Sequence, residues 1–212
     1  MPKSILFDLD GTLTDSGEGI MNCAEKTLRH FGITPPDRTA MRSFVGPPLL
    51  DSFPRFGVPA DKAREAVQIY RSFYVPEGMF QNFPYPGIEE LLIKLKAEGY
   101  QLFVATAKPE HMSITILDAF GLSKYFQQIY GATVDGLPDT KAAVISRLLE
   151  AYPEARDAVM VGDTAIDVKG AAAHHIPTIG VSWGYGEVAD MEKAGAIAIA
   201  HTMDELYELL TK

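Results

Sequence analysis

The stretch ILFDLDGTLTD, at positions 5–15, decides how this chain folds. Its apolar start predicts a buried strand, which ends in two carboxylates, Asp8 and Asp10, followed by Gly11. Residues i and i+2 of an extended chain point the same way, so both carboxylates are expected to face one crevice. A divalent cation would hold these like charges together, and Gly11 permits the sharp turn of an anion-accepting loop. A plain Asp-Gly turn explains this pattern equally well when it is taken alone.

The composition limits the class of protein. The chain has 212 residues, 47% of them hydrophobic, which suits one core and a smaller second lobe. The net charge of −9, without any basic run, argues against a nucleic-acid polymer or an anionic membrane as partner. No run of about 18 apolar residues occurs and the first residues lead directly into an apolar strand, so we expect neither a membrane span nor a signal peptide, and the single cysteine is typical of a reducing compartment. We therefore expect a cytoplasmic protein. Its protein partner is expected to be at most a second copy of the chain, in a monomer or a homodimer.

Short apolar runs alternate with segments of helical period along most of the chain. Apolar runs without polar alternation are typical of a parallel sheet that is covered on both faces. The order therefore predicts an α/β fold with a doubly wound, Rossmann-like sheet, which binds ligands at the carboxyl ends of its strands. The predicted strands lie near 4–7, 101–105, 128–130, 158–161, 178–181 and 196–199, and the helices at about 87–98, 109–120, 140–151, 164–174, 187–194 and 203–210.

One segment, residues 17–83, interrupts the alternation. It shows helical periodicity and no convincing strand, so it predicts an all-α cap subdomain inserted into the α/β core, which comprises 1–16 and 84–212. Turn-forming sequences flank the insertion at 14–17 and 82–87, where hinges are expected.

A second acidic pair follows the strand predicted near 158–161. Gly162 and Asp163 end that strand, and Asp167 lies about one helical turn beyond Asp163. Aspartates also cap helix N-termini, which explains this pair by itself. That explanation does not account for the recurrence of acidic pairs at two strand ends of one sheet.

Two further polar residues are expected at the same edge. Thr106 ends the strand at 101–105, and its hydroxyl could donate to a phosphate oxygen. Lys141 opens the helix after the strand at 128–130 and could offset a cluster of carboxylates. Taken alone, the threonine is better explained as a helix cap, and the lysine as a solvated charge.

These four elements together resemble the motifs of the haloacid dehalogenase superfamily, and the resemblance spans the chain. The segments FVGPPL, at 44–49, and VSWGYG, at 181–186, resemble its phosphoglycolate-phosphatase-like branch with a helical C1-type cap, which includes enzymes described as pyrophosphatases or 5′-nucleotidases. The matched motifs are Asp8-Leu9-Asp10-Gly11-Thr12-Leu13, Thr106, Lys141, and Gly162-Asp163 with Asp167.

The resemblance implies a phosphatase that hydrolyses a small-molecule phosphomonoester through an aspartyl-phosphate, so a small phosphate ester is the partner that we expect. Asp8 is then the nucleophile, and Asp10 gives a proton to the leaving oxygen and later takes one from water. Mg²⁺ is held by Asp8, the Asp10 carbonyl and Asp163, while Asp167 either ligates it through water or orients Lys141. Thr106 and Lys141 complete the catalytic set. Substrate contacts are expected from Gly11, Thr12, Ala107, Gly46 and Arg42.

Some alternatives stay open at this stage. Lys108 follows the second motif closely and competes with Lys141 for the phosphate, although Lys141 stands where the family's lysine belongs. The cap arginines Arg38, Arg42 and Arg55 could read a second anionic group of the substrate. A β-phosphoglucomutase-like phosphomutase would keep the same core, and a non-enzymatic aspartyl phospho-acceptor combines similar residues. A dehalogenase is disfavoured because it needs no acid at position 10.

Overall fold

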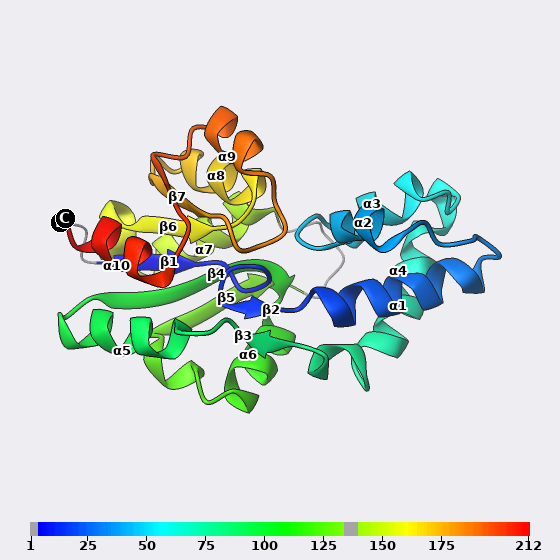
Figure 1. Cartoon of the computed structure of the whole chain (residues 1–212), viewed down its shortest axis with the longest axis horizontal. Helices are drawn as coiled ribbons and strands as arrows, with labels where there is room; N and C mark the ends of the chain where they lie inside the picture. The colour runs from blue at the N-terminus through cyan, green and yellow to red at the C-terminus, as the bar shows by residue number, and fades with distance from the viewer. Residues whose placement is uncertain (1–3, 134–139) are drawn as a thin grey trace.

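A computed structural model describes residues 4–133 and 140–212 of the chain. Within these residues, one sheet contains six parallel strands in the order β5-β4-β1-β6-β7-β8 (Figure 1). This confirms the predicted α/β fold. The strands are β1 (Ser4–Phe7), β4 (Gln101–Pro109), β5 (Gln128–Ala132), β6 (Val159–Gly162), β7 (Thr178–Val181) and β8 (Ala198–Ala200).

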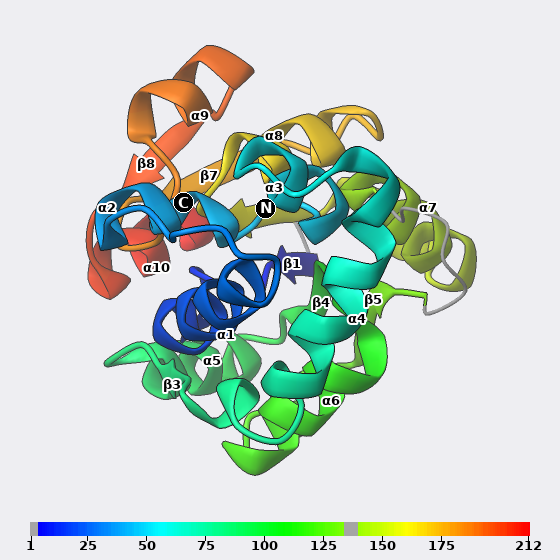
Figure 2. The same ribbon diagram turned by 90° about the vertical axis from the view of Figure 1, so that its right-hand side faces the viewer.

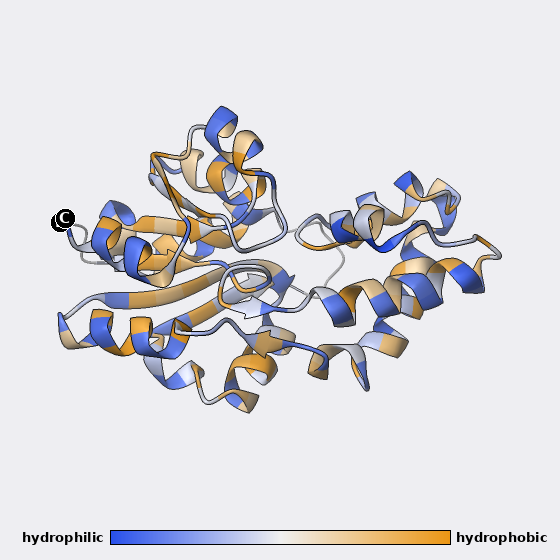
Figure 3. Cartoon of the chain, in the orientation of Figure 1, coloured by the Kyte–Doolittle hydropathy of each residue, from blue (hydrophilic) through white to orange (hydrophobic). Residues whose placement is uncertain are grey.

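Helices cover both faces of this sheet. In β1, Ile5 and Phe7 belong to the core on one face of the sheet, whereas Leu6 belongs to the core on the other face. Both faces of a strand are thus buried, which explains the apolar runs and the predominantly apolar strands in Figure 3. The helices are α5 (Ile88–Ala97), α6 (Glu110–Ala119) and α10 (Met203–Thr211) on one face, and α7 (Lys141–Ala151), α8 (Ala165–Ala172) and α9 (Val188–Ala194) on the other.

The strand order reverses beside β1. The chain builds β4 and β5 on one side of β1 and then crosses over to build β6, β7 and β8 on the other side. In open α/β sheets, the loops at such a switch point separate and leave a crevice at the carboxyl ends of the strands. The residues that follow β1 and β6 therefore border that crevice.

The segment between β2 (Thr14–Asp15) and β3 (Phe83–Pro84) contains α-helices and 3₁₀ turns but no strand. These two short strands pair antiparallel and hold the two ends of the segment together. Strands of two residues have no detectable period, so the sequence indicated only turns here. The helices of the segment are α1 (Gly17–His30), α2 (Arg38–Met41), α3 (Leu49–Arg55) and α4 (Ala63–Tyr74), with 3₁₀ turns at Arg42–Phe44, Ala60–Lys62 and Gly78–Phe80.

The inserted helices have an aromatic core of their own. The Phe53 ring lies between Phe44 and Tyr70, at centroid distances of 5.3 and 6.1 Å. Figure 2 shows α1 and α4 in front of the sheet, at the end where β1 and β4 finish. The insertion therefore covers the crevice at the switch point. No helix in the described part of the chain is long and apolar enough to cross a membrane.

Candidate active site

Three carboxylates converge where β1 and β6 end. Asp8 continues β1, and its main-chain N–H donates to the Val161 carbonyl of β6 at 2.9 Å. The side chains of Asp8, Asp163 and Asp167 are buried, and one oxygen from each lies within 4.8 Å of the others. The structure thus brings together acidic residues that lie more than 150 positions apart in the sequence.

Hydrogen bonds fix the carboxylate of Asp163 from two sides. One oxygen accepts from the Thr12 hydroxyl at 3.2 Å, and the other accepts from the Tyr185 main-chain N–H at 2.8 Å. Asp167 is held differently, since one of its oxygens accepts from the main-chain N–H and the hydroxyl of Thr164 and so caps α8. Asp167 therefore caps a helix and still directs its second oxygen at the cluster.

The Lys141 ammonium joins these carboxylates. It lies 2.7 Å from Asp8 and 2.8 Å from Asp167, and it donates to the Ala105 carbonyl at 2.9 Å. Thr140 caps α7 by accepting from the Ala143 N–H, which starts the helix at Lys141 and points this buried side chain toward the switch point. Lys141 thus occupies the position at the acidic cluster that the sequence suggested.

One ammonium does not balance three buried carboxylates. Burial raises the pKa of Asp8 to about 6, and repulsion by Asp167 adds to this effect. Burial likewise raises the pKa of Asp163 to about 8, with further repulsion from Asp167 and Asp8. Two formal negative charges remain when all groups are ionised, and a divalent cation would neutralise them. An all-oxygen donor set of this kind fits Mg²⁺.

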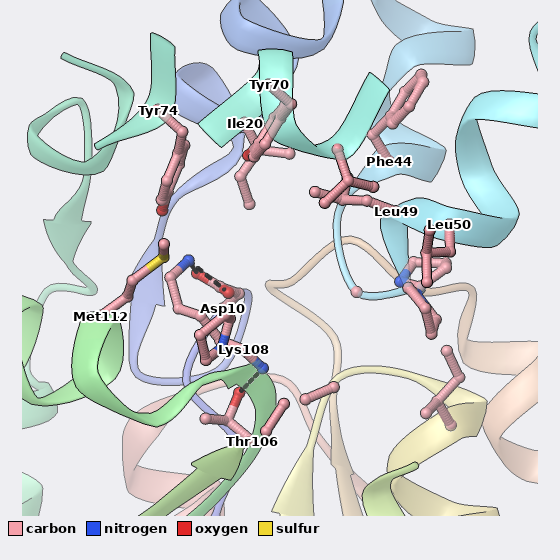
Figure 4. A pocket seen from close by; sticks show the side chains of 18 of the residues that line it. Asp10, Ile20, Phe44, Leu49, Leu50, Tyr70, Tyr74, Thr106, Lys108 and Met112 are labelled. Atoms are coloured by element: carbon pink, nitrogen blue, oxygen red, sulfur yellow. Dashed lines mark hydrogen bonds and ion pairs between the residues drawn. The ribbon is translucent and has the colours of Figure 1, made fainter. Parts of the chain in front are cut away.

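A second lysine belongs to the other aspartate of the first motif. The Lys108 ammonium lies 2.8 and 2.9 Å from the two oxygens of Asp10, and both side chains are mostly buried. The Lys108 main-chain N–H donates to the Thr106 hydroxyl at 3.2 Å, within the irregular part of β4 between Ala105 and Pro109 (Figure 4). Each lysine therefore forms an ion pair with one aspartate of the first motif: Lys141 pairs with Asp8, and Lys108 pairs with Asp10.

A cavity of about 340 Å³ lies above these groups. Its floor consists of core residues, among them Asp8, Asp10 and Lys108. Figure 4 shows its roof, where apolar and aromatic side chains from the insertion point down toward Asp10 and Lys108. The cavity is thus enclosed between a charged floor and a largely apolar roof. The roof residues are Ile20, Phe44, Leu49, Leu50, Tyr70 and Tyr74.

The predicted substrate contacts fall into two groups. Ala107 and Gly46 line the cavity together with the catalytic candidates, Thr106 among them. Gly11 and Thr12 lie against Asp163 instead: a Cβ at Gly11, whose φ is +85°, would come within 2.2 Å of the Asp163 carboxylate. The Thr12 side chain is fully buried and donates to Asp163.

Of the cap arginines suggested by the sequence, none lines the cavity. Arg42 was expected to contact substrate, but its guanidinium donates to the Gly184 carbonyl at 3.2 Å and lies over the Tyr185 ring. Arg38 donates to the Asn22 side chain. In this structure the Arg42 side chain therefore joins the insertion to a core loop.

That core loop, residues 182–186, contributes more to the site than the sequence indicated. The Trp183 indole donates to the Thr12 carbonyl at 3.2 Å, and the Tyr185 hydroxyl bonds Asp15 and accepts from the Gly17 N–H. A Cβ at Gly184 would lie 2.3 Å from the Asp163 carboxylate, so only glycine permits this approach. The glycines after β7 were the available signal, but their partners are distant in the sequence.

A family model matches the part of the chain that contains the acidic cluster and Lys141. The model for haloacid dehalogenase-like hydrolases covers residues 5–181. The chain belongs to this family. Among solved structures, a predicted phosphatase from Clostridium acetobutylicum superimposes on this haloacid dehalogenase-like protein with a TM-score of 0.95, at 41% identity, covering 100% of this chain and 99% of the other.

Curated relatives carry different functional names. The tyrosine-protein kinase PtkA of Mycobacterium tuberculosis is 39% identical over 99% of this chain and 72% of its own length. A 5′-nucleotidase of Pseudomonas aeruginosa is 39% identical over 86% of this chain and 84% of its own. A phosphoglycolate phosphatase of Rhodospirillum rubrum is 31% identical, with 94% and 87% covered. This haloacid dehalogenase-like hydrolase thus has phosphatases among its relatives, in the branch that the sequence resembles.

Proposed function

We propose that this protein is a Mg²⁺-dependent phosphatase that hydrolyses a small phosphomonoester through an aspartyl-phosphate intermediate. The observation that carries the proposal is the buried cluster of Asp8, Asp163, Asp167 and Lys141 at the bottom of a roofed cavity. A phosphoryl group brings negative charge, so it needs positive charge beside the nucleophile. Lys141 and a divalent cation would supply it there.

Asp8 and Asp10 have surroundings that suit different roles. Asp8 attacks the phosphorus, the bond to the ester oxygen breaks, and Asp10 gives that oxygen a proton. Water then attacks the aspartyl-phosphate, Asp10 takes a proton from it, and phosphate leaves with Asp8 restored. The Asp10 side chain lies on the cavity floor, where Lys108 holds it, and from there it would give its proton to the leaving oxygen.

Asp8, Asp163 and the Asp10 carbonyl would hold the Mg²⁺ ion, and Asp167 would act through Lys141 or a bridging water. When bound, the ion would neutralise charge on the phosphoryl oxygens. We also propose that the inserted helices, residues 17–83, are a cap that keeps bulk water away while Asp8 attacks. The apolar roof in Figure 4 supports this role.

The experiment measures phosphate release from p-nitrophenyl phosphate, phosphoglycolate, nucleoside 5′-monophosphates, sugar phosphates and pyrophosphate. Activity on at least one ester is expected, with loss in EDTA and recovery with Mg²⁺. Hydrolysis that persists in EDTA contradicts the proposal. An isomerised sugar phosphate without net release would instead identify a phosphomutase, and a stable aspartyl-phosphate without turnover would identify a phospho-acceptor.

The likeness to a protein named tyrosine-protein kinase makes phosphoryl transfer to a tyrosine the second candidate. Both functions need the same charged floor, and they differ in whether water or a hydroxyl receives the phosphoryl group. Incubation with γ-labelled ATP and a tyrosine-containing polypeptide separates them. Label on the polypeptide supports transfer, whereas label recovered only as free phosphate supports the hydrolase.

A further inference from the structure

One face of α4 forms a wall of the cavity. Arg64, Val67, Arg71 and Tyr74 all line the cavity, and their spacing of three or four residues places them along one side of the helix. At 1.5 Å per residue, Arg71 lies about 4.5 Å along the axis from Tyr74, and Arg64 about 15 Å from it. This face of α4 therefore extends from Tyr74, which lies above Lys108, to Arg64 at the other end of the helix.

Arg64 and Arg71 have no ion-pair or hydrogen-bond partner among the residues that the structure describes. Arg29 and Arg38 in the same insertion are bonded to Glu25 and Asn22. Two unpaired guanidinium groups on a cavity wall are notable in a chain of net charge −9.

The acidic residues that line the cavity lie elsewhere. Asp8, Asp10 and Asp167 are on the floor, where Lys108 and Lys141 pair with them. The α4 wall itself contributes no carboxylate to the described lining. The cavity thus has a floor of paired charges and a separate wall whose positive charge is unpaired.

Tyr74 provides the polar group nearest the floor. Its side chain is 2% exposed, and its hydroxyl lies beside the Lys108 ammonium, which is 4.8 Å from the ring centre. Figure 4 shows this hydroxyl directed into the cavity above Lys108. A lysine ammonium can only donate, so the hydrogen of this buried hydroxyl is available to an acceptor atom of a ligand.

Between these polar groups the cavity is apolar. Ile20, Leu49 and Val67 are among its apolar lining residues, and the volume of about 340 Å³ falls in the range of roughly 300–1,000 Å³ that holds drug-sized ligands. A two-carbon phosphate ester would leave most of this apolar surface in contact with water. A longer ester with an apolar or aromatic body would cover it.

We propose that Arg64 and Arg71 form a second anion-binding subsite. The preferred substrate is then a phosphomonoester of an apolar or aromatic alcohol that carries a second anionic group, a carboxylate or a phosphate, away from the ester to be cleaved. Tyr74 donates to this substrate close to the ester. The inference rests on the proposed phosphatase function and specifies the substrate class of the same site.

Three aryl esters test the subsite because they share one body. They are 4-carbamoylphenyl phosphate, 4-carboxyphenyl phosphate and 1,4-phenylene bisphosphate, which differ at the far end by a neutral amide, a carboxylate and a second phosphate. We expect kcat/KM for at least one of the two esters with an anionic far end to exceed that of the carbamoyl ester by roughly tenfold, as a charged hydrogen bond allows. The comparison of the two anionic esters tells which anion is preferred.

The double variant Arg64→Gln/Arg71→Gln is expected to bring that kcat/KM ratio close to one. Arg55→Gln is the matched control, because Arg55 belongs to the same insertion but not to the cavity lining, and it should keep the wild-type ratio. Tyr74→Phe is expected to raise KM for all three esters without changing the ratio. Thermal unfolding of each variant with Mg²⁺ confirms that it is folded.

The outcomes separate the two proposals. Release of phosphate from the carbamoyl ester, without preference for either anionic ester, overturns the subsite and leaves the phosphatase standing. A preference that survives in the double variant also overturns the subsite. Release from none of these esters, nor from the substrate panel above, overturns the phosphatase and the subsite with it.

Discussion

At the scale of single residues, Asp8 and Asp10 lie only two positions apart, yet their carboxylates have different surroundings. Asp8 is buried beside two other aspartates, and its pKa is raised to about 6. Asp10 lies two positions further on and is held by both oxygens on the Lys108 ammonium. The strand end thus separates a buried nucleophile candidate from a proton-shuttle candidate.

Replacing the nucleophile candidate tests the chemistry directly. Asp8→Asn should reduce phosphate release from p-nitrophenyl phosphate by more than roughly a thousandfold, because an amide is a poor nucleophile. The variant should be at least as stable as the wild type in EDTA, since it removes a buried, repelled charge. Near wild-type turnover in a folded Asp8→Asn protein rules out the aspartyl-phosphate.

Lys108 is expected to matter for stability as well as for catalysis. Lys108→Met leaves the mostly buried Asp10 carboxylate without its partner, which should cost about 3 kcal/mol in urea unfolding. Asp10→Asn in the same chain should restore part of that loss, with a coupling free energy of about 2 kcal/mol. Lys26→Met is the control: its ion pair with Glu77 is exposed, so the change should stay within about 1 kcal/mol. Equal costs for the two lysines would argue against a special role for Lys108.

At the scale of elements, the loop at 182–186 connects three parts of the site. Its Tyr185 N–H holds Asp163, and its Tyr185 hydroxyl bonds Asp15 in the β2–β3 ribbon. The Tyr185 ring also packs beneath Arg42 from the insertion, 4.8 Å from the guanidinium carbon. The loop therefore ties an acidic ligand candidate to both the hinge and the inserted helices.

Tyr185→Phe removes only the hydroxyl from this connection. We expect a loss of stability of about 1 kcal/mol and a several-fold lower kcat/KM for phosphate release, because the hinge loses two hydrogen bonds at Asp15 and Gly17. Tyr207→Phe loses a comparable bond to Glu98, far from the cavity, and should leave kcat/KM unchanged. If both variants affect kcat/KM equally, the hinge contact has no part in activity.

At the scale of the whole molecule, the acidic cluster makes stability depend on pH and on metal. The folded-state pKa values of Asp8 and Asp163 are raised to about 6 and about 8, above the ordinary value of 3.8. At a pH between the ordinary value of 3.8 and these raised values, Asp8 and Asp163 hold protons in the folded chain that they have released in the unfolded chain. Stability therefore falls as pH rises through this window in metal-free protein.

Thermal unfolding across about pH 5 to pH 8 measures this effect. In EDTA the midpoint should fall with rising pH, and Mg²⁺ should raise it most at the alkaline end, because metal binding needs deprotonated carboxylates. Asp163→Asn is the control variant: its midpoint should vary less with pH and respond less to Mg²⁺. A stabilisation by Mg²⁺ that is the same in both proteins would place the ion elsewhere.

The local pattern of the chain determined the sheet, its helices and the acidic strand ends. Apolar runs such as those of β1 and β7 indicate strands whose two faces are both buried, and such a run is visible in consecutive residues of the sequence. The same holds for Asp8 and Asp163, because parallel strands necessarily bring their carboxyl ends to one edge. These features depend on short sequence separations and on one topological rule.

Only the tertiary structure decided how the charges are paired and what faces the cavity. Lys108 pairs with Asp10 across 98 positions, Arg42 turns to the loop at 182–186, and Arg64 and Arg71 remain on the cavity wall. Such pairings depend on the direction of long side chains and on how two separately packed units meet. The periodicity of the sequence contains no information on those directions. The acidic centre could therefore be predicted from the sequence, whereas the arrangement of the cations around it depended on the tertiary structure.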